Sequence, residues 1–167
     1  MMEASAQEKL VSVINEKFEG EILEGRMDRD FFTLVLKKEK IVDIISHLYH
    51  HPETQFQYLT TMFAVHYPDQ NQIGMVYQLH NLMTNQRIRL KIFLPADNPT
   101  TPTLTPVFSA ANWMEREAYD FFGVISQGHP NLKRILNVED MMIFPMRKEY
   151  PLEDQTREDK NDLMFGR

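Results

Sequence analysis

The chain has 167 residues, 43% of them hydrophobic, with 24 acidic against 18 basic side chains, a formal net charge of −6 and no cysteine. This length is typical of a single domain with a buried core, which excludes disorder over most of the chain. The acidic balance argues against a nucleic-acid-binding protein, and the lack of cysteine excludes disulfides, a thiolate nucleophile and cysteine ligands for an iron–sulfur cluster.

Two helices are predicted in the first third of the chain. Ser5 followed by Glu8 is a capping-box pattern, and it predicts a helix over residues 6–18. Apolar residues at i, i+3, i+4 and i+7 predict a second amphipathic helix, which ends before Pro52. The apolar stripe of this second helix consists of Ile41, Ile44, Ile45 and Leu48.

Five strands are predicted by β-branched and apolar residues. The first two, near residues 21–25 and over 30–37, form a hairpin, and the third, over 57–67, reverses through a turn at 68–71. Residues that alternate with period two are Leu59, Thr61, Phe63, Val65 and Tyr67 in the third strand, Ile73, Met75, Tyr77 and Leu79 in the fourth, and Ile88, Leu90, Ile92 and Leu94 in the fifth. The order α-β-β-α-β-β-β predicts a two-layer α+β domain with helices against a largely antiparallel sheet.

The remainder of the chain has less periodicity. Residues 95–106 are rich in proline and threonine and predict a loop that ends the sheet, before a short helix over 112–122. Residues 146–167 are charged and cannot build a core of their own, so we expect an extended tail that is mobile or lies on another protein. We therefore divide the chain into an α+β core domain, 1–128, and an extended C-terminal segment for subunit docking, 129–167.

The sequence has few features of an enzyme or a membrane protein. No apolar run approaches the roughly 18–20 residues of a membrane helix, and the N-terminus lacks the layout of a signal peptide. Phosphate-binding glycine loops, a nucleophile elbow and a zinc-protease motif are also absent. We expect a soluble protein that binds rather than catalyses and that reaches a membrane only through a partner.

Two polar clusters have both a functional and a simpler interpretation. Three histidines have metal-ligand spacing, but we favour a solvated helix end, with Asp43 paired to the first of them; they are His47, His50 and His51. Three cations share one face of the fifth strand and form either a solvated sheet face or a docking surface for an acidic partner, with nucleic-acid binding as a weaker third interpretation; they are Arg87, Arg89 and Lys91.

The helix over 112–122 carries the densest cluster of charges. Asn112 is the expected N-cap, and Gly123 is expected to take the left-handed conformation after the last turn. Two of its carboxylates are two residues apart and point in different directions, so they cannot act on one substrate. The side chains of Trp113, Arg116, Glu117 and Asp120 are expected to form a recognition surface that includes an Arg116–Asp120 pair at i, i+4.

Three ordered blocks in the last third of the chain resemble the C subunit of NADH:quinone oxidoreductase, respiratory complex I. They are Glu115-Arg116-Glu117-x-x-Asp120-Phe121-Phe122-Gly123, Gly128-His129-Pro130-x-Leu132-x-Arg134-Ile135-Leu136, and Pro145-x-Arg147-Lys148-x-Tyr150-Pro151-Leu152. The resemblance covers roughly residues 30–152. His66 departs from it, because the family commonly has an acidic residue directly before the Tyr-Pro pair at 67–68.

The resemblance implies a non-catalytic subunit that holds no cofactor and lies in the hydrophilic arm, peripheral to the cytoplasmic face of the bacterial inner membrane. Its implied partners are the quinone-site subunit, which is D-like, and the iron–sulfur subunits, which are B-like and I-like. FMN, iron–sulfur clusters, NADH and quinone would belong to partner subunits. The implied structural and interface residues are Trp113, Glu115, Arg116, Glu117, Asp120, His129, Pro130, Arg134, Arg147, Tyr150 and Pro151.

Two other interpretations stay open at this point. The chain could be the homologous subunit of a membrane-bound hydrogenase or of a ferredoxin-driven complex, or it could be a free-standing small enzyme.

Overall fold

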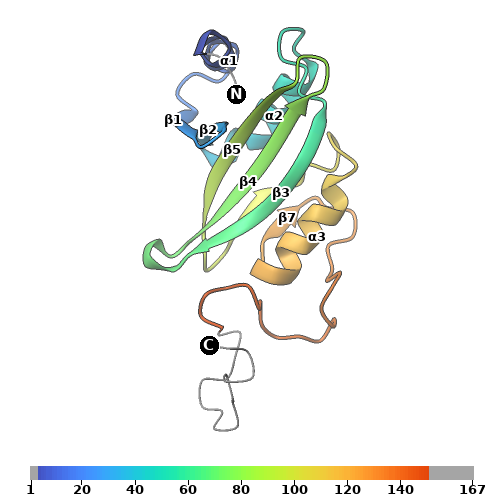
Figure 1. Ribbon diagram of the computed structural model, residues 1–167. Helices are drawn as coiled ribbons and strands as arrows, with labels where there is room; N and C mark the ends of the chain where they lie inside the picture. The colour runs from blue at the N-terminus through green and yellow to red at the C-terminus, as the bar shows by residue number, and fades with distance from the viewer. Residues whose placement is uncertain (1–3, 151–167) are drawn as a thin grey trace, which may run out of the picture.

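A five-stranded sheet forms the centre of the computed structural model, which describes residues 4–150 (Figure 1). The strands follow the order β1-β2-β5-β4-β3, and only the contact between β2 and β5 is parallel. Their bounds are β1 Ile22–Asp28, β2 Phe31–Leu36, β3 Tyr58–Tyr67, β4 Gln72–Asn81 and β5 Gln86–Pro95. The predicted α+β fold with a largely antiparallel sheet is confirmed.

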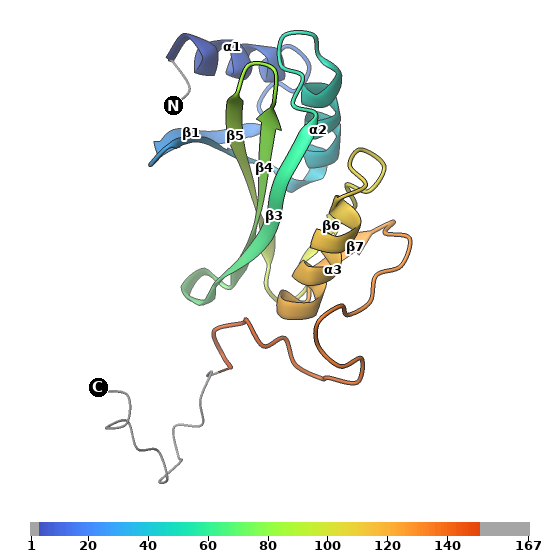
Figure 2. The same ribbon diagram turned by 45° about the vertical axis from the view of Figure 1, so that its right-hand side comes forward.

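Helices α1 (Ala4–Asn15) and α2 (Ile41–His50) pack on one face of this sheet (Figure 2). All four residues of the predicted stripe on α2 are fully buried. Ser5 lies inside α1 instead of preceding it as a cap, and the helix ends at Asn15 because residues 16–19 turn toward β1.

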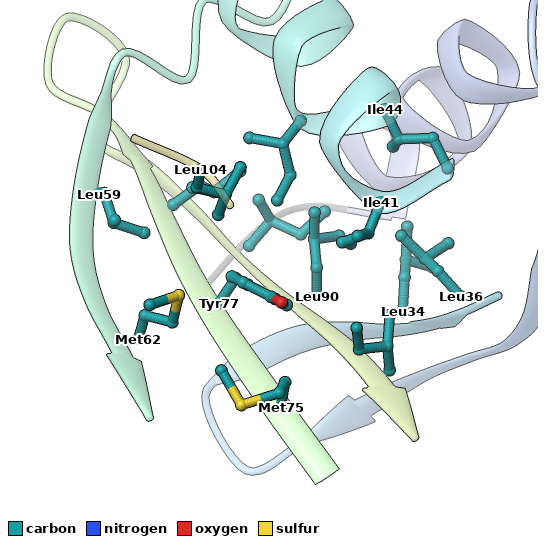
Figure 3. Packing of buried hydrophobic residues seen from close by; sticks show 14 of the residues in the cluster. Leu34, Leu36, Ile41, Ile44, Leu59, Met62, Met75, Tyr77, Leu90 and Leu104 are labelled. Carbon is teal, nitrogen blue, oxygen red and sulfur yellow. The ribbon is translucent and has the colours of Figure 1, made fainter. Parts of the chain in front are cut away.

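The core lies between α2 and the sheet. Figure 3 shows Ile41 and Ile44 of α2 pointing toward leucines of β2 and β5. The predicted inward residues of β4 and β5 are all at most 1% exposed. Burial of each large apolar side chain contributes about 1.5–3 kcal/mol, so this layer explains why the sheet forms.

The prediction of which β3 residues face the core is wrong over most of the strand. A register shift between Leu59 and Thr61 adds a residue to β3 and reverses the alternation beyond it. The side chains that face the core are therefore Leu59, Met62, Ala64 and His66, whereas Phe63 is 39% exposed.

The second part of the fold packs beside β3. Strands β6 (Thr100–Pro102) and β7 (Ile125–Gln127) form a parallel pair. Helix α3 (Ala111–Phe122) lies between these two strands in the sequence. The prediction that 95–106 is only a loop is thus wrong for three residues, which have no periodicity to reveal them. Residues 129–150 contain no helix or strand. Within the described part of the chain, no helix is long and apolar enough to cross a membrane.

Candidate functional site

Helix α3 begins one residue before the prediction and has no side-chain cap. Residues 104–110 already wind into turns, and the carbonyl oxygens of Phe108, Ser109 and Ala110 accept the N–H groups of residues 111–113. Asn112 is therefore inside the helix and not its N-cap. At the other end, Gly123 takes the left-handed conformation with φ 76°, as predicted.

Glu115 is 1% exposed and fixes the loop that leads into α3. Its carboxylate oxygens accept hydrogen bonds from the Thr103 hydroxyl and the Leu104 N–H, both at 2.6 Å. Glu117, two residues further, is exposed to solvent. The two carboxylates thus face different surroundings and form no acid–base pair.

Asp120 is fully buried, and its partner is Arg134 instead of the predicted Arg116. Oδ1 accepts hydrogen bonds from the Arg134 guanidinium at 2.8 Å and from the Asn137 side-chain amide at 3.0 Å. Oδ2 accepts the backbone N–H groups of residues 135–137 at 2.8–3.1 Å. The i, i+4 prediction fails because a later segment crosses this side of α3 and surrounds the carboxylate with donors.

Arg134 is 7% exposed and joins three parts of the chain. Its Nη1 also donates to the Asp120 carbonyl at 2.7 Å, and its Nη2 donates to the carbonyls of Met141 and Ile143 at 2.6 and 2.8 Å. These bonds hold residues 129–150, which we call the docked segment, against the end of α3.

Arg116 binds the same segment from the exposed side of α3. Its guanidinium donates to the carbonyls of Lys133 and Arg134 at 3.0 and 2.9 Å, and it lies 5.4 Å from the centroid of the Trp113 ring. Trp113 is 57% exposed. Of the expected recognition surface, this indole and Glu117 are therefore the parts that face solvent.

His129 connects the start of the docked segment to the start of α3. Its Nε2 donates to the Asn112 carbonyl at 3.1 Å, and its Nδ1 accepts the Asn131 N–H at 3.0 Å. Pro130 beside it is exposed.

The far end of the docked segment is held by Arg147, which donates to the Phe122 carbonyl at 2.8 Å. The centroid of the Phe144 ring lies 5.2 Å from the guanidinium of Arg134 and 5.1 Å from that of Arg147. This ring also fills the space at Gly123, where an added Cβ would lie 2.6 Å from it.

A further attachment reaches β3. The Lys148 N–H donates to Nδ1 of His66 at 3.0 Å, and the Glu149 carboxylate lies 3.6 Å from the same nitrogen. The unusual His66 thus serves as an acceptor for the docked segment. Tyr150 is half-buried, and its N–H donates to the Arg147 carbonyl at 3.1 Å. Pro151 and most of the expected tail, 151–167, lie outside the described residues.

Electrostatics agree with a structural carboxylate at Asp120. Burial alone would raise the pKa of Asp120, but hydrogen bonds from Asn137, Arg134 and the Leu136 N–H outweigh it and hold the pKa well below its ordinary value. Burial raises the pKa of Tyr77 in β4 far above its ordinary value. This effect outweighs the lowering by a hydrogen bond with Thr101, and the Glu115 carboxylate adds to the increase. Neither group is set up to exchange a proton near neutral pH.

The histidines of α2 bind backbone atoms. His47 donates to the Val13 carbonyl at 3.3 Å, and His50 donates to the Ser46 carbonyl at 2.8 Å. Asp43 pairs with Lys40 at 3.3 Å and not with His47 as predicted. Among residues 4–150, no group of three or more histidine and carboxylate side chains could hold a metal ion.

Comparison with known proteins shows to which family the chain belongs. A family model described as "Respiratory-chain NADH dehydrogenase, 30 Kd subunit" matches residues 34–156. The chain belongs to this family. The resemblance inferred from the three sequence blocks is thereby confirmed.

Relatives within the 30 kDa subunit family include the NADH-quinone oxidoreductase C subunit of Geotalea uraniireducens, which is 34% identical over 95% of this chain and 96% of its own length. The C subunit of Geobacter sulfurreducens is 36% identical over 90% of this chain and 93% of its own. That of Mycolicibacterium gilvum is 39% identical over 74% of this chain, which spans only 56% of the relative's length.

Two solved structures are similar to this member of the 30 kDa subunit family. A chain of the membrane-bound sulfane sulfur reductase, an archaeal respiratory membrane complex, has a TM-score of 0.74 at 25% identity and covers 92% of this chain and 96% of its own. The trypsin-resistant fragment of Nqo5 has a TM-score of 0.61 at 23% identity, covers 75% of this chain and 98% of its own, and supports the fold.

Proposed function

We propose that this chain is a non-catalytic structural subunit in the hydrophilic arm of a proton-translocating NADH–quinone oxidoreductase, where it supports the quinone-site subunit. One observation carries the proposal: five charged side chains of the sequence blocks bind other side chains and backbone atoms of this chain. They are Glu115, Arg116, Asp120, Arg134 and Arg147. Every oxygen of the Asp120 carboxylate has a donor within the chain, and so does each oxygen of Glu115. Carboxylates engaged in this way hold a segment of the chain in position, and their hydrogen bonds are already made within the chain instead of with a substrate.

The docked segment supplies a surface for the partner. Its backbone is fixed by Arg134, Arg116 and Arg147, while several of its apolar side chains point outward. The exposed fractions are 68% for Leu136, 64% for Val138, 92% for Met142, 39% for Ile143 and 51% for Met146. Five exposed apolar side chains on a backbone that is fixed at several points are typical of an interface.

The partners of this surface would be the D-like quinone-site subunit and the B-like and I-like iron–sulfur subunits. FMN, the iron–sulfur clusters, NADH and quinone would be bound by other chains, because a chain without cysteine offers no thiolate for a cluster. The protein would lie at the cytoplasmic face of the bacterial inner membrane and contact the membrane only through the complex. Trp113 and Glu117, exposed on α3, would extend the interface.

A second candidate follows from the archaeal structural neighbour, which belongs to a different respiratory membrane complex and has the higher TM-score of the two. The same module could then support the large subunit of a membrane-bound hydrogenase or a ferredoxin-driven complex. The genes adjacent to the one for this chain would distinguish the two, because genes for NADH- and FMN-binding subunits would favour the first.

The interface is tested by two methionines of nearly equal exposure. Met142 in the docked segment is 92% exposed, and Met83 at the tip of the β4–β5 hairpin is 89% exposed. We expect Met142→Glu to leave the isolated chain folded but to lower the yield of intact complex by about tenfold, since a buried unpaired charge costs several kcal/mol. Met83→Glu serves as the control with the same charge change. Normal complex yield with Met142→Glu would contradict the proposed interface.

A further inference from the structure

The sheet face opposite α1 and α2 carries a row of three cations on β5. Figures 1 and 2 show α2 and α3 on the same side of the sheet, and among the described residues no helix lies over the other side. Arg87, Arg89 and Lys91 alternate with the buried residues of β5 and therefore share this open face. We call them, with the aromatic residues beside them, the basic face.

Aromatic rings hold two of these cations in place. Arg89 lies 4.5 Å from the centroid of the Phe31 ring, and Lys91 lies 4.6 Å from the centroids of both Tyr67 and Phe93. The Lys91 ammonium also donates to the Tyr67 hydroxyl at 2.7 Å. Cation–π contacts and this hydrogen bond restrict the side chains, so less conformational entropy is lost when they bind a ligand.

The layer formed by these side chains is tightly packed. Beneath it, Thr33, Val35 and Val76 are only 2%, 7% and 4% exposed, although they face the open side of the sheet. The basic face is therefore an ordered surface and not a set of freely rotating side chains.

Most of the positive charge on this face is not neutralised within the described part of the chain. Arg89 pairs with Asp28 at 3.2 Å. Arg87 is exposed and makes no ion pair with any residue between 4 and 150, and the same is true of Lys91. Two cations without an ion pair on one face, one on each side of Arg89, are unexpected on a chain with a net charge of −6.

We propose that the basic face binds an extended acidic segment of a neighbouring subunit, with carboxylates at alternate residues. Successive cations on β5 are about 6–7 Å apart, which is also the spacing of alternate side chains in an extended partner chain. Nucleic acid fits less well, because the cations cover the aromatic rings on which bases would stack. This inference depends on the proposed function, since it takes the partner from the same complex.

Charge reversal at the exposed cation tests the contact. We expect Arg87→Glu to increase the fraction of this chain released from the isolated complex in 0.3 M NaCl by about fivefold, because like charges would then face each other. Lys9→Glu is the matched control, since Lys9 is exposed on α1, on the covered side of the sheet, and makes no ion pair with a described residue. Equal release of the two variants would overturn the proposal.

Zero-length cross-linking identifies the chemistry of the partner. In the intact complex, the amine introduced by Arg87→Lys is expected to couple through a carbodiimide to an aspartate or glutamate of another subunit. Mass spectrometry of the product gives the partner residue. Coupling only to this chain's own carboxylates, or none, would overturn the basic face as a docking site. Such a result would leave the proposed function standing, since Met142→Glu tests that function independently.

Discussion

Asp120 illustrates how one carboxylate can replace regular secondary structure. Residues 129–150 have no helix or strand to satisfy their backbone, yet three consecutive N–H groups, of residues 135–137, donate to Asp120 Oδ2. Arg134 binds two carbonyls of the same segment. Together these two side chains supply the bonds that a strand pairing would otherwise make.

Replacement of Asp120 by asparagine should therefore be strongly destabilising. Asp120→Asn keeps the shape but leaves the buried Arg134 without its counter-charge, and removal of one partner of a buried pair costs about 3–5 kcal/mol. Asp43→Asn is the control, because Asp43 pairs with Lys40 at the surface, where a pair contributes about 1 kcal/mol or less. Denaturant unfolding measures both. Equal losses would show that Asp120 is not a buried anchor.

The depressed pKa of Asp120 also predicts acid sensitivity. Because its pKa is lower in the folded than in the unfolded chain, the unfolded chain binds the extra proton as pH falls. The stabilisation from Asp120 is present above about pH 5 and is lost progressively below about pH 4. Unfolding midpoints at pH 7 and pH 3 should differ more for the natural chain than for Asp120→Asn. If the midpoints at pH 7 and pH 3 differed by the same amount in the natural chain and in Asp120→Asn, Asp120 would not be the origin of the acid sensitivity.

The Asp120–Arg134 pair could not be predicted from the sequence, although both residues stand in the blocks that resemble the family. Short-range rules connect residues four apart on a helix, and they suggest Arg116. The actual partner, Arg134, lies beyond Gly128 in a segment without periodicity. No sequence pattern indicates that Asn137 and Phe144 contact the end of α3. The sequence does predict the turn at Gly123, because glycine directly after an amphipathic helix is typical of the left-handed residue that ends it.

At the scale of elements, periodicity predicts α2 and β5 well, since each has one buried face with a single clear period. It also gives the inward residues of β4, although that strand is buried on both faces. It fails for β3, because apolar residues occur on both sides of that strand and conceal the register shift. It also fails for β6 and β7, which have three residues each and are defined by their pairing with one another.

The junction between α3 and the docked segment can be tested at Gly123. Gly123→Ala would combine a strained φ of 76° with a contact of 2.6 Å to the Phe144 ring, so we expect the segment to detach. Gly20→Ala is a matched control, since Gly20 has φ 75° and no heavy atom within 4 Å of an added Cβ. Hydrogen exchange at residues 135–137 should become at least tenfold faster in the first variant only. Equal exchange in both would show that Phe144 does not anchor the segment.

On the scale of the whole molecule, the sheet separates two different surfaces. The docked segment presents apolar side chains beside α3, and the basic face presents fixed cations on the opposite side of β5. An interface core is typically apolar, and charges contribute mainly to the specificity and rate of association. Two surfaces of such different chemistry would allow the chain to contact two neighbours in a defined orientation.

The last prediction concerns the activity of the chain alone. The purified chain is expected to show no flavin or iron absorbance and no NADH oxidation, because it lacks cysteine and its buried signature carboxylates, Glu115 and Asp120, are engaged in internal bonds. Removal of the chain from cells should nevertheless lower NADH–quinone reductase activity, since the remaining subunits would assemble poorly. Restoring the natural chain should recover that activity, whereas Met142→Glu should not. Stoichiometric iron or flavin retained by the isolated chain, or NADH oxidation by it, would refute a purely architectural role.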